Sequence, residues 1–348
     1  MYYPRESIIT STIRSFFRSF AVFIGFFTAL MLILFGLISL SSPYIQPEKS
    51  TLLLSPDAKG QRQLIGPTSD VILKLDISGI IGIKNLTTEK ITSLLIDAQE
   101  GVLKNDRVKA VVLYINTPGG TVTDSDGIYR AIMNFKTKHK LSVYAYVDGM
   151  CASGGMYIAC AADKVFASSN SVIGSVGVRF GPAFNFSTLM QCYGVEALTI
   201  TQGKDKDALN PFRPWKEDED LSYRNLTSAM YQQFVNLVTS ARPALNKQKL
   251  ISDYGAHVFI SEEALEYGYI DVANSSYNET LEALASRANL ESYQVMTIQL
   301  AHNFLSELSQ ARCSFIEKMS HLFSPRPHSL HPELEGKFLY LYQPGQLL

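Results

Sequence analysis

The chain has 348 residues, of which 46% are hydrophobic and 18% charged, and its formal net charge is −1. A chain of this length and hydrophobic content can bury a sizeable core, as one large or two modest globular units. The balanced charge gives no basis for nucleic-acid binding, which usually requires an excess of Lys and Arg. The cysteines at positions 151, 160, 192 and 313 form no C-x-x-C pair, which argues against a zinc site or a thioredoxin-type motif and leaves disulfides open.

An uncharged apolar run near the N-terminus predicts a membrane-spanning helix over residues 19–41. At 1.5 Å per residue this run can cross a hydrocarbon core about 30 Å thick, and it is longer than the apolar part of a typical signal peptide. Arginines precede the run and no Lys follows until Lys49, so the positive-inside rule places residues 1–18 in the cytoplasm and the rest beyond the cytoplasmic (inner) membrane. A cleaved signal peptide ending near residues 39–41 is the alternative.

Residues 42–70 carry four prolines among polar residues and are predicted to be a linker. From residue 71 the pattern becomes an alternation of strands and helices. Strands are predicted at 71–77, 110–115 and 143–147, and helices at 88–103 and 125–135. A continuous apolar run such as 110–115 is typical of a strand buried on both faces. The alternation predicts an α/β domain with parallel strands over residues 71–290.

The stretch 144–167, YAYVDGMCASGGMYIACAADKVFA, places Ser153 where a strand turns into a helix. Small residues on both sides leave space around the hydroxyl, and the first N–H groups of the helix can face an oxyanion beside it. The ordinary alternative is that Ser153 caps the helix. The pattern G-x-S-x-G is only half present, because Cys151 replaces the first glycine, so an α/β-hydrolase is not indicated. Cys151 and Cys160 are expected to pack as small hydrophobic residues.

A second glycine-bearing turn, INTPGGT, follows the strand at 110–115. Glycine has no Cβ, so the backbone at Pro-Gly-Gly can approach a ligand closely, although an ordinary tight turn is the simpler interpretation. Phosphate binding is disfavoured, because neither G-x-x-x-x-G-K-[ST] nor G-x-G-x-x-G occurs here. A third stretch, SVIGSVGV at 171–178, predicts a strand with bends at Gly174 and Gly177.

A serine nucleophile needs a base, and the sequence offers His257, Lys204 and Lys206. The other histidines lie in a basic run or in and near a proline-bearing tail. A Ser-His-Asp triad through His257 and a Ser-Lys pair both stay open. A lysine at its ordinary pKa of about 10.4 is protonated at pH 7 and needs burial to act as a base. A solvated lysine between two aspartates is the ordinary interpretation of Lys206.

The order of these motifs resembles the membrane-bound serine peptidases of family S49, the signal peptide peptidase A group of bacteria. The similarity covers about residues 71–273 and rests on INTPGGT, CASGGMYIACAADKVFA, SVIGSVGV and GKDKDALNPFRP. Two downstream stretches, YQQFVNLVTSAR and VFISEEALEYGYID, also match in family order. Thr117 and Cys151 depart from the family pattern, and the C-terminal region shows little likeness to it.

The resemblance implies that Ser153 is the nucleophile and Lys206 the general base, with Lys204 the alternative by register. It implies oxyanion donors in the backbone of Gly120 and Gly154. The implied fold is a Clp protease/crotonase-like α/β spiral of ββα units, preceded by one N-terminal transmembrane helix in membrane lipid. A homo-oligomeric ring, no cofactor, no metal and no nucleic-acid partner are further implications.

Implied substrates are cleaved signal peptides and other membrane-associated peptides. A catalytically inactive membrane scaffold and a non-peptidase acyl-CoA enzyme of the same fold are the alternative functions.

Residues 291–348 are predicted to form a C-terminal helix, linker and tail. Helical spacing extends over 299–322, prolines and histidines mark a linker over 324–332, and KFLYLY at 337–342 is predicted to be a terminal strand. No function follows from the sequence of this region.

Overall fold

The computed structural model describes residues 8–40, 50–62, 64–66, 68–101, 103–300 and 337–342. The chain divides into two compact units, Met1–Lys49 and Ser50–Leu348. In the first unit, α1 (Ile8–Leu40) is one continuous helix. Its segment Ile8–Ile33 has a mean hydropathy of 2.0, and none of its residues is buried. By length and composition this segment is a candidate membrane span. The helix begins before the predicted span because no Pro or Gly interrupts residues 8–18.

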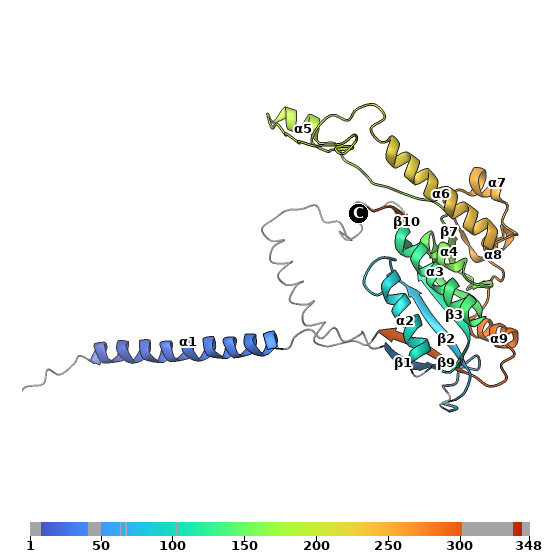
Figure 1. Ribbon diagram of the computed structural model, residues 1–348, viewed down its shortest axis with the longest axis horizontal. Coiled ribbons are helices and arrows are strands. Elements are labelled where there is room, and N and C mark those ends of the chain that lie inside the picture. Colours follow the sequence, from blue (N-terminus) through green and yellow to red (C-terminus); the bar gives the residue numbers. More distant parts are fainter. Residues whose placement is uncertain are drawn as a thin grey trace, which may run out of the picture. The chain divides into compact units, whose positions relative to one another are not determined.

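The second unit is an α/β structure around an eight-stranded sheet with the order β1-β9-β2-β3-β5-β7-β8, in which β6 pairs with β5 (Figure 1). The strands are β1 (Ser50–Ser55), β2 (Val71–Ser78), β3 (Val108–Thr117), β5 (Ser142–Ala152), β6 (Lys164–Ala167), β7 (Val172–Gly174), β8 (Val258–Ile260) and β9 (Gln294–Leu300). Strands β9, β2, β3, β5, β6 and β7 run parallel, whereas β1 and β8 are antiparallel to their neighbours. The predicted α/β fold with a parallel core is confirmed.

Helices cover both faces of the sheet because the central strands are apolar on both faces. In β3, Val111 and Leu113 belong to one buried cluster, and Ala110 and Val112 belong to the other. The first cluster packs under α2 (Thr88–Glu100), α3 (Val122–His139), α4 (Gly154–Ala159) and α6 (Leu221–Ala241). The second packs under α9 (Tyr277–Arg287). This period of two along one apolar run is the geometry expected for a strand between two helical layers.

The shorter elements complete the unit. They are β4 (Gly119–Thr121), α5 (Ser187–Cys192), α7 (Lys247–Lys249), the π-helix η1 (Leu250–Tyr254), α8 (Ser261–Glu266) and β10 (Leu339–Leu341). Strands β4 and β10 pair with each other as a separate two-stranded antiparallel sheet. The predicted terminal strand over 337–342 is therefore confirmed, and it lies beside the Pro-Gly-Gly turn.

The predicted linker over 42–70 is wrong for residues 50–55. These residues form β1, which pairs antiparallel with β9 from Ser50↔Leu300 to Ser55↔Val295. The prolines that suggested a linker lie outside this strand, and β1 covers the backbone edge of β9 that would otherwise be unpaired. The predicted helix over 299–322 is likewise wrong at residues 299–300, which belong to β9, and its remainder lies outside the described residues.

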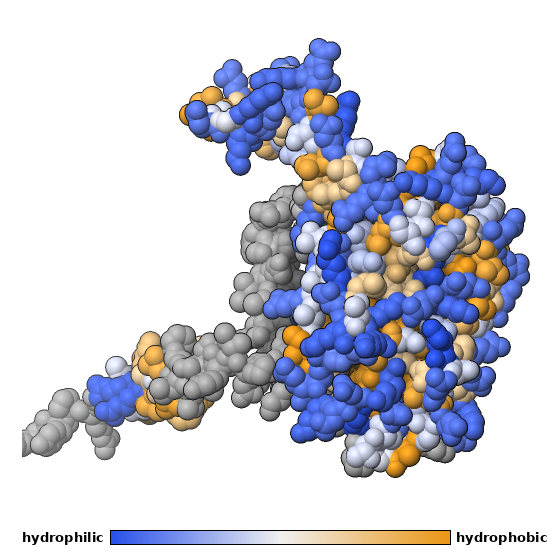
Figure 2. Space-filling view, turned by 45° about the vertical axis from the view of Figure 1, so that its right-hand side comes forward, coloured by the Kyte–Doolittle hydropathy of each residue, from blue (hydrophilic) through white to orange (hydrophobic). Residues whose placement is uncertain are grey.

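Residues 181–220, here called the arm, project from the rest of the second unit (Figure 1). The arm contains α5 and little other regular structure. Figure 2 shows it as a projection in which hydrophobic residues lie among hydrophilic ones. Its exposed large apolar side chains are Phe184, Phe186, Leu189, Tyr193, Val195, Leu198, Ile200, Phe212 and Trp215. Exposed apolar side chains gathered on one segment are typical of an interaction surface.

Candidate active site

Ser153 lies between β5 and α4 in a strained backbone conformation, with φ 55° and ψ −112°. Two hydrogen bonds hold it there: its N–H donates to Gly174 O at 2.8 Å, and its carbonyl accepts from Tyr157 N at 3.0 Å. The residue is 1% exposed, and its side chain makes no capping hydrogen bond. The capping interpretation is therefore wrong. A buried, strained serine that does not cap its helix is a candidate functional position.

Arg242 anchors the other end of α4. Its guanidinium donates to the carbonyl oxygens of Ala159 at 3.1 Å and Ala162 at 3.0 Å, and to Asp271 Oδ2 at 2.8 Å. The side chain is 4% exposed, and these bonds tie the end of α4 and the turn after it to Asp271. The buried guanidinium of Arg242 therefore helps to hold α4 in place, together with Ser153, which immediately precedes this helix.

The two cysteines beside Ser153 are buried and free. Burial raises the pKa of the Cys160 thiol to about 12, and burial also raises the pKa of the Cys151 thiol. A thiol attacks as the thiolate, so neither group is a competing nucleophile. The predicted core packing of Cys151 and Cys160 is confirmed. Cys192 is free and exposed, and Cys313 lies outside the described residues.

The Pro-Gly-Gly turn runs alongside the strained serine. Thr117 pairs with Cys151 in the parallel β3–β5 ladder, and its Oγ1 accepts from Gly119 N at 3.1 Å. On one side of β4, Ile81 N donates to Gly119 O at 2.8 Å and Thr121 N donates to Ile81 O at 3.1 Å. Because hydrogen-bonding directions alternate along a strand, Gly120 directs its N–H to the opposite side, toward β10.

Backbone groups of three segments meet at this point. A Cβ added at Gly119 would lie 2.8 Å from Gly154 N and 1.9 Å from Tyr340 O. A Cβ added at Gly154 would lie 2.4 Å from Ser125 Oγ and 3.2 Å from Tyr340 O. The structure therefore brings Gly154, the residue after Ser153, next to the Gly119-Gly120 turn and to Tyr340. Only glycine allows the three segments to approach so closely.

Substitution of Gly120 tests this close approach. A Cβ at position 120 would lie 1.9 Å from Ile81 O, so Gly120→Ala must displace β4. We expect it to lower the free energy of unfolding by about 1–3 kcal/mol, the usual effect of overpacking. Gly66→Ala is the matched control, because nothing lies within 4 Å of a Cβ there. Thermal unfolding compares the variants, and equal melting temperatures would contradict the packing described here.

The candidate lysines lie apart from this cluster. Lys204 and Lys206 are exposed residues of the arm. In the described part of the chain, no hydrogen bond or ion pair joins either of them to Ser153. Hence one copy of the described chain brings together the nucleophile and oxyanion candidates but not the base.

The segment after Lys206 is held by charged hydrogen bonds. Arg213 bridges Asp207 and Glu219, and its Nη1 donates to Glu219 Oε2 at 2.9 Å. Glu219 also accepts from the backbone N–H of Leu209 at 2.7 Å. Hydrogen bonds from Arg213 lower the pKa of Glu219 to about 2. The carboxylate of Asp207, the residue after Lys206, is therefore paired with Arg213 and not with Lys206.

His257 is near the cluster only through its backbone. Its carbonyl accepts from Ser175 N at 2.7 Å, and Ser175 follows the residue that accepts from Ser153 N. The imidazole is exposed and packs edge-on against Phe259 at a ring separation of 6.5 Å. In the described residues it makes no hydrogen bond to Ser153, so the structure does not assemble a Ser-His pair.

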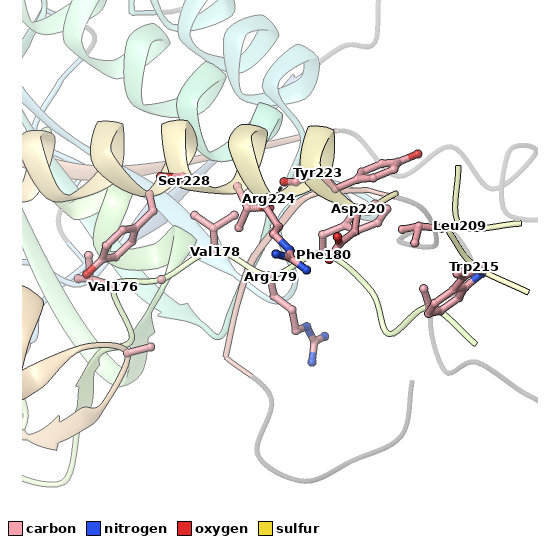
Figure 3. Close-up of a pocket in the computed structure, with 15 residues that line it drawn as sticks. Val176, Val178, Arg179, Phe180, Leu209, Trp215, Asp220, Tyr223, Arg224 and Ser228 are labelled. Atoms are coloured by element: carbon pink, nitrogen blue, oxygen red, sulfur yellow. Dashed lines mark hydrogen bonds and ion pairs between the residues drawn. The ribbon is translucent and has the colours of Figure 1, made fainter. Parts of the chain in front are cut away.

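A groove of about 820 Å³ lies beside the cluster, between the segment Val176–Phe180, the first turns of α6 and part of the arm. Figure 3 shows Val176 at one end of this groove and Leu209 and Trp215 of the arm at the other. Phe180 stacks on Tyr223 with ring centroids 4.6 Å apart, and its ring lies 5.0 Å from the tilted ring of Phe338. The groove therefore adjoins the C-terminal strand.

No motif in the sequence places Ile81, Ser125 or Tyr340 in this cluster. Ile81 contributes by backbone pairing and Ser125 by packing. Neither contribution depends on a residue type that could be recognised in the sequence. Tyr340 lies in KFLYLY, whose alternation predicted a strand but could not indicate its partner more than two hundred residues away.

Comparisons with known proteins cover most of the second unit. The model of peptidase family S49 matches residues 134–291, and that of Clp protease matches residues 66–173. A protein of Methanocaldococcus jannaschii named as a protease is 31% identical over 58% of this chain. A protein of Enterococcus faecium named as a signal peptide peptidase is 29% identical over 65% of this chain. The chain spans 63% and 66% of the lengths of these two relatives.

A solved structure of a mutant Clp protease subunit of Listeria monocytogenes is 18% identical, with a TM-score of 0.38. It covers 61% of this chain and 94% of its own. The Clp protease model, together with the parallel sheet and its helical layers, identifies the second unit as a Clp protease-like α/β fold.

Proposed function

Because this chain is a member of peptidase family S49, we propose that it is a membrane-anchored serine endopeptidase with a Ser-Lys dyad. Ser153 is the nucleophile, Lys206 is the general base, and the backbone N–H groups of Gly120 and Gly154 bind the oxyanion. The strongest support is the buried, strained Ser153 next to the backbone of the Pro-Gly-Gly turn. The substrates are cleaved signal peptides and other membrane-associated peptides.

The proposed reaction proceeds in two steps. The Lys206 amine takes the proton of Ser153 Oγ as that oxygen attacks the peptide carbonyl, and the lysine then gives the proton to the leaving amine. The same lysine activates a water molecule that hydrolyses the acyl-enzyme. Two backbone donors at the position of the developing oxyanion stabilise both tetrahedral intermediates, and removing one such donor typically costs about 10²–10³ in kcat.

A homo-oligomer, with a ring as the proposed form, accounts for the position of the base. Lys206 lies on an arm with nine exposed large apolar side chains, and such a segment favours burial against another surface. In a head-to-tail assembly each arm reaches the neighbouring copy. We therefore propose that Lys206 of one subunit serves Ser153 of the next, and that closure of the interface excludes water from the amine.

Hydrolysis of a fluorogenic peptide by the purified full-length chain in detergent tests the proposed function. Turnover that is blocked by a serine-directed fluorophosphonate supports a serine peptidase. Absence of turnover with every peptide tested, together with absence of labelling, would favour the inactive scaffold. Hydration or isomerisation of an acyl-CoA would favour the non-peptidase alternative.

The proposed location is the cytoplasmic (inner) membrane, with the N-terminus in the cytoplasm and the peptidase domain on the opposite side. Arg14 and Arg18 precede the most apolar part of α1, which supports this orientation. Cys192 is exposed and free, so a membrane-impermeant maleimide can report the side on which it lies.

We expect Cys192 to be labelled in intact spheroplasts of a Cys313→Ser variant. A cysteine introduced at exposed position 11, by Ser11→Cys, is expected to react only after lysis. Cys192→Ser is the control for labelling at the intended residue. Labelling of Ser11→Cys before lysis, with protection of Cys192, would show that the orientation is reversed.

A further inference from the structure

Thr117 is the last residue of β3, and its side chain is buried at the start of the Pro-Gly-Gly turn, with 0% of the residue exposed. Its hydroxyl donates to Gly79 O at 2.5 Å and accepts from Gly119 N at 3.1 Å. Replacing such a buried hydroxyl by an apolar group is costly, because both partners lose a hydrogen bond. Thr117 therefore ties the turn to the segment that follows β2.

Two consecutive peptide groups of the turn are held by hydrogen bonds. The N–H of the Pro118–Gly119 peptide donates to Thr117 Oγ1, and the carbonyl of the Gly119–Gly120 peptide accepts from Ile81 N at 2.8 Å. In a planar trans peptide the C=O and N–H groups point in opposite directions, so the second bond also sets the direction of the Gly120 N–H. Gly119 has φ 99°, and because glycine is conformationally permissive, contacts from outside the turn must keep it in one shape.

The methyl group of Thr117 lies beside the first turn of α4. Its carbon atom is 2.7 Å from the position that a Cβ would take at Gly155, and the carbonyl oxygen of Thr117 is 3.3 Å from the same position. Gly155 follows Gly154, whose N–H is the other proposed oxyanion donor. One buried side chain therefore joins the turn that carries the first donor to the helix end that carries the second.

We propose that Thr117 is a positioning residue, which holds the N–H groups of Gly120 and Gly154 at the spacing that the oxyanion of the tetrahedral intermediate requires. The inference rests on the proposed function, because it concerns the same reaction. The hydroxyl fixes the turn, and the methyl group packs against α4. Thr117 acts through the two glycines and takes no part in proton transfer. Such positioning matters because a displacement of about 1 Å at a reacting centre can lower a rate about 10²-fold.

The test compares Thr117→Val, which keeps the shape of the side chain and loses the hydroxyl, with the natural full-length chain in detergent. We expect kcat for a fluorogenic peptide to fall about 10–100-fold and KM to change less than about twofold, because oxyanion donors act on the transition state. Thr117→Ser keeps the hydroxyl, so its kcat should fall only slightly. Thr280→Val is the matched control and should retain activity. Thr280 is also 0% exposed, and its hydroxyl donates to Ser276 O at 3.0 Å in α9, on the opposite face of the sheet.

The pH dependence separates a role in the oxyanion hole from an effect on the base. In Thr117→Val, kcat should fall by the same factor at every pH, because the group that must lose its proton is Lys206. The rate at which a fluorophosphonate labels Ser153 should fall in parallel, since the phosphonyl oxygen occupies the oxyanion position. If Thr117→Val fails to fold, Thr117→Ala is compared with Thr117→Ser. These two variants differ by one hydroxyl, and we expect the lower kcat in Thr117→Ala.

Equal kcat in folded Thr117→Val, Thr280→Val and the natural chain would overturn the inference while leaving the proposed function intact. A loss in Thr117→Ser as large as that in Thr117→Val would also overturn it, because the hydroxyl would then not be the group that matters. A shifted pH profile in Thr117→Val would overturn it by assigning Thr117 to the surroundings of the base. Absence of both turnover and labelling in the natural chain would instead overturn the proposed function and, with it, this inference.

Discussion

Replacement of Ser153 by alanine is expected to abolish peptide hydrolysis and to leave folding and membrane insertion intact. The change removes one hydroxyl that makes no capping hydrogen bond, at a residue whose backbone is held by Gly174 and Tyr157. Loss of the nucleophile should lower kcat by on the order of 10⁶-fold, as in other serine peptidases. The free energy of unfolding should change by less than about 0.5 kcal/mol.

Turnover of a fluorogenic peptide and thermal unfolding measure these two effects. Ser261→Ala is the matched control, because Ser261 is also fully buried but lies on α8, outside the cluster around Ser153. It should retain activity. Activity near the natural level in Ser153→Ala would overturn the assignment of the nucleophile.

The second large effect is expected at Lys206. Lys206→Ala should reduce kcat nearly as far as Ser153→Ala, because the members of a catalytic unit are strongly non-additive. Lys206→Arg should not restore activity, since a guanidinium keeps its proton at any working pH. Turnover by the natural enzyme should rise with pH and level off on the alkaline side, because a lysine base must first lose its proton. With a histidine base, the rise of turnover with pH would occur nearer to pH 6.5.

Lys204→Ala is the closest control, since both lysines lie on the same exposed segment of the arm. An active Lys206→Ala variant paired with an inactive Lys204→Ala variant would move the base by two residues. Loss of activity in His257→Ala alone would replace the dyad by a triad. The proposal for Lys206 depends on the family match, because the described chain does not join it to Ser153.

Mixing the two inactive variants tests whether the dyad forms between subunits. In a mixed assembly of Ser153→Ala and Lys206→Ala chains, some sites combine an intact serine with an intact lysine from a neighbour. Random mixing in a head-to-tail ring should restore about a quarter of the activity. No recovery in an assembly that demonstrably contains both chains would show that the dyad forms within one subunit, with a different position of the arm.

Local patterns in the sequence predicted those parts of the fold that local chemistry determines. The apolar run 110–115 predicted a strand buried on both faces, and its residues do alternate between the two core clusters. The small residues around Ser153 predicted a strand-to-helix junction, which lies between β5 and α4. These features depend on residue type and spacing within a few positions.

Pairings between distant segments could not be predicted in the same way. Strand β1 lies in a proline-bearing stretch and is ordered by pairing with β9, and β10 is ordered by pairing with β4. The backbone conformation of Ser153 also depends on distant contacts, including the bond to Gly174. The position of Lys206 relative to Ser153 is the hardest feature to predict from the sequence, since it depends on where the arm packs.

The most direct test of the central claim is mass-spectrometric mapping of the fluorophosphonate adduct on the natural full-length chain. We predict a single adduct at Ser153, absent from Ser153→Ala and greatly reduced in Lys206→Ala. An adduct at another serine, or undiminished labelling of Ser153→Ala, would contradict the assignment of this residue as the nucleophile.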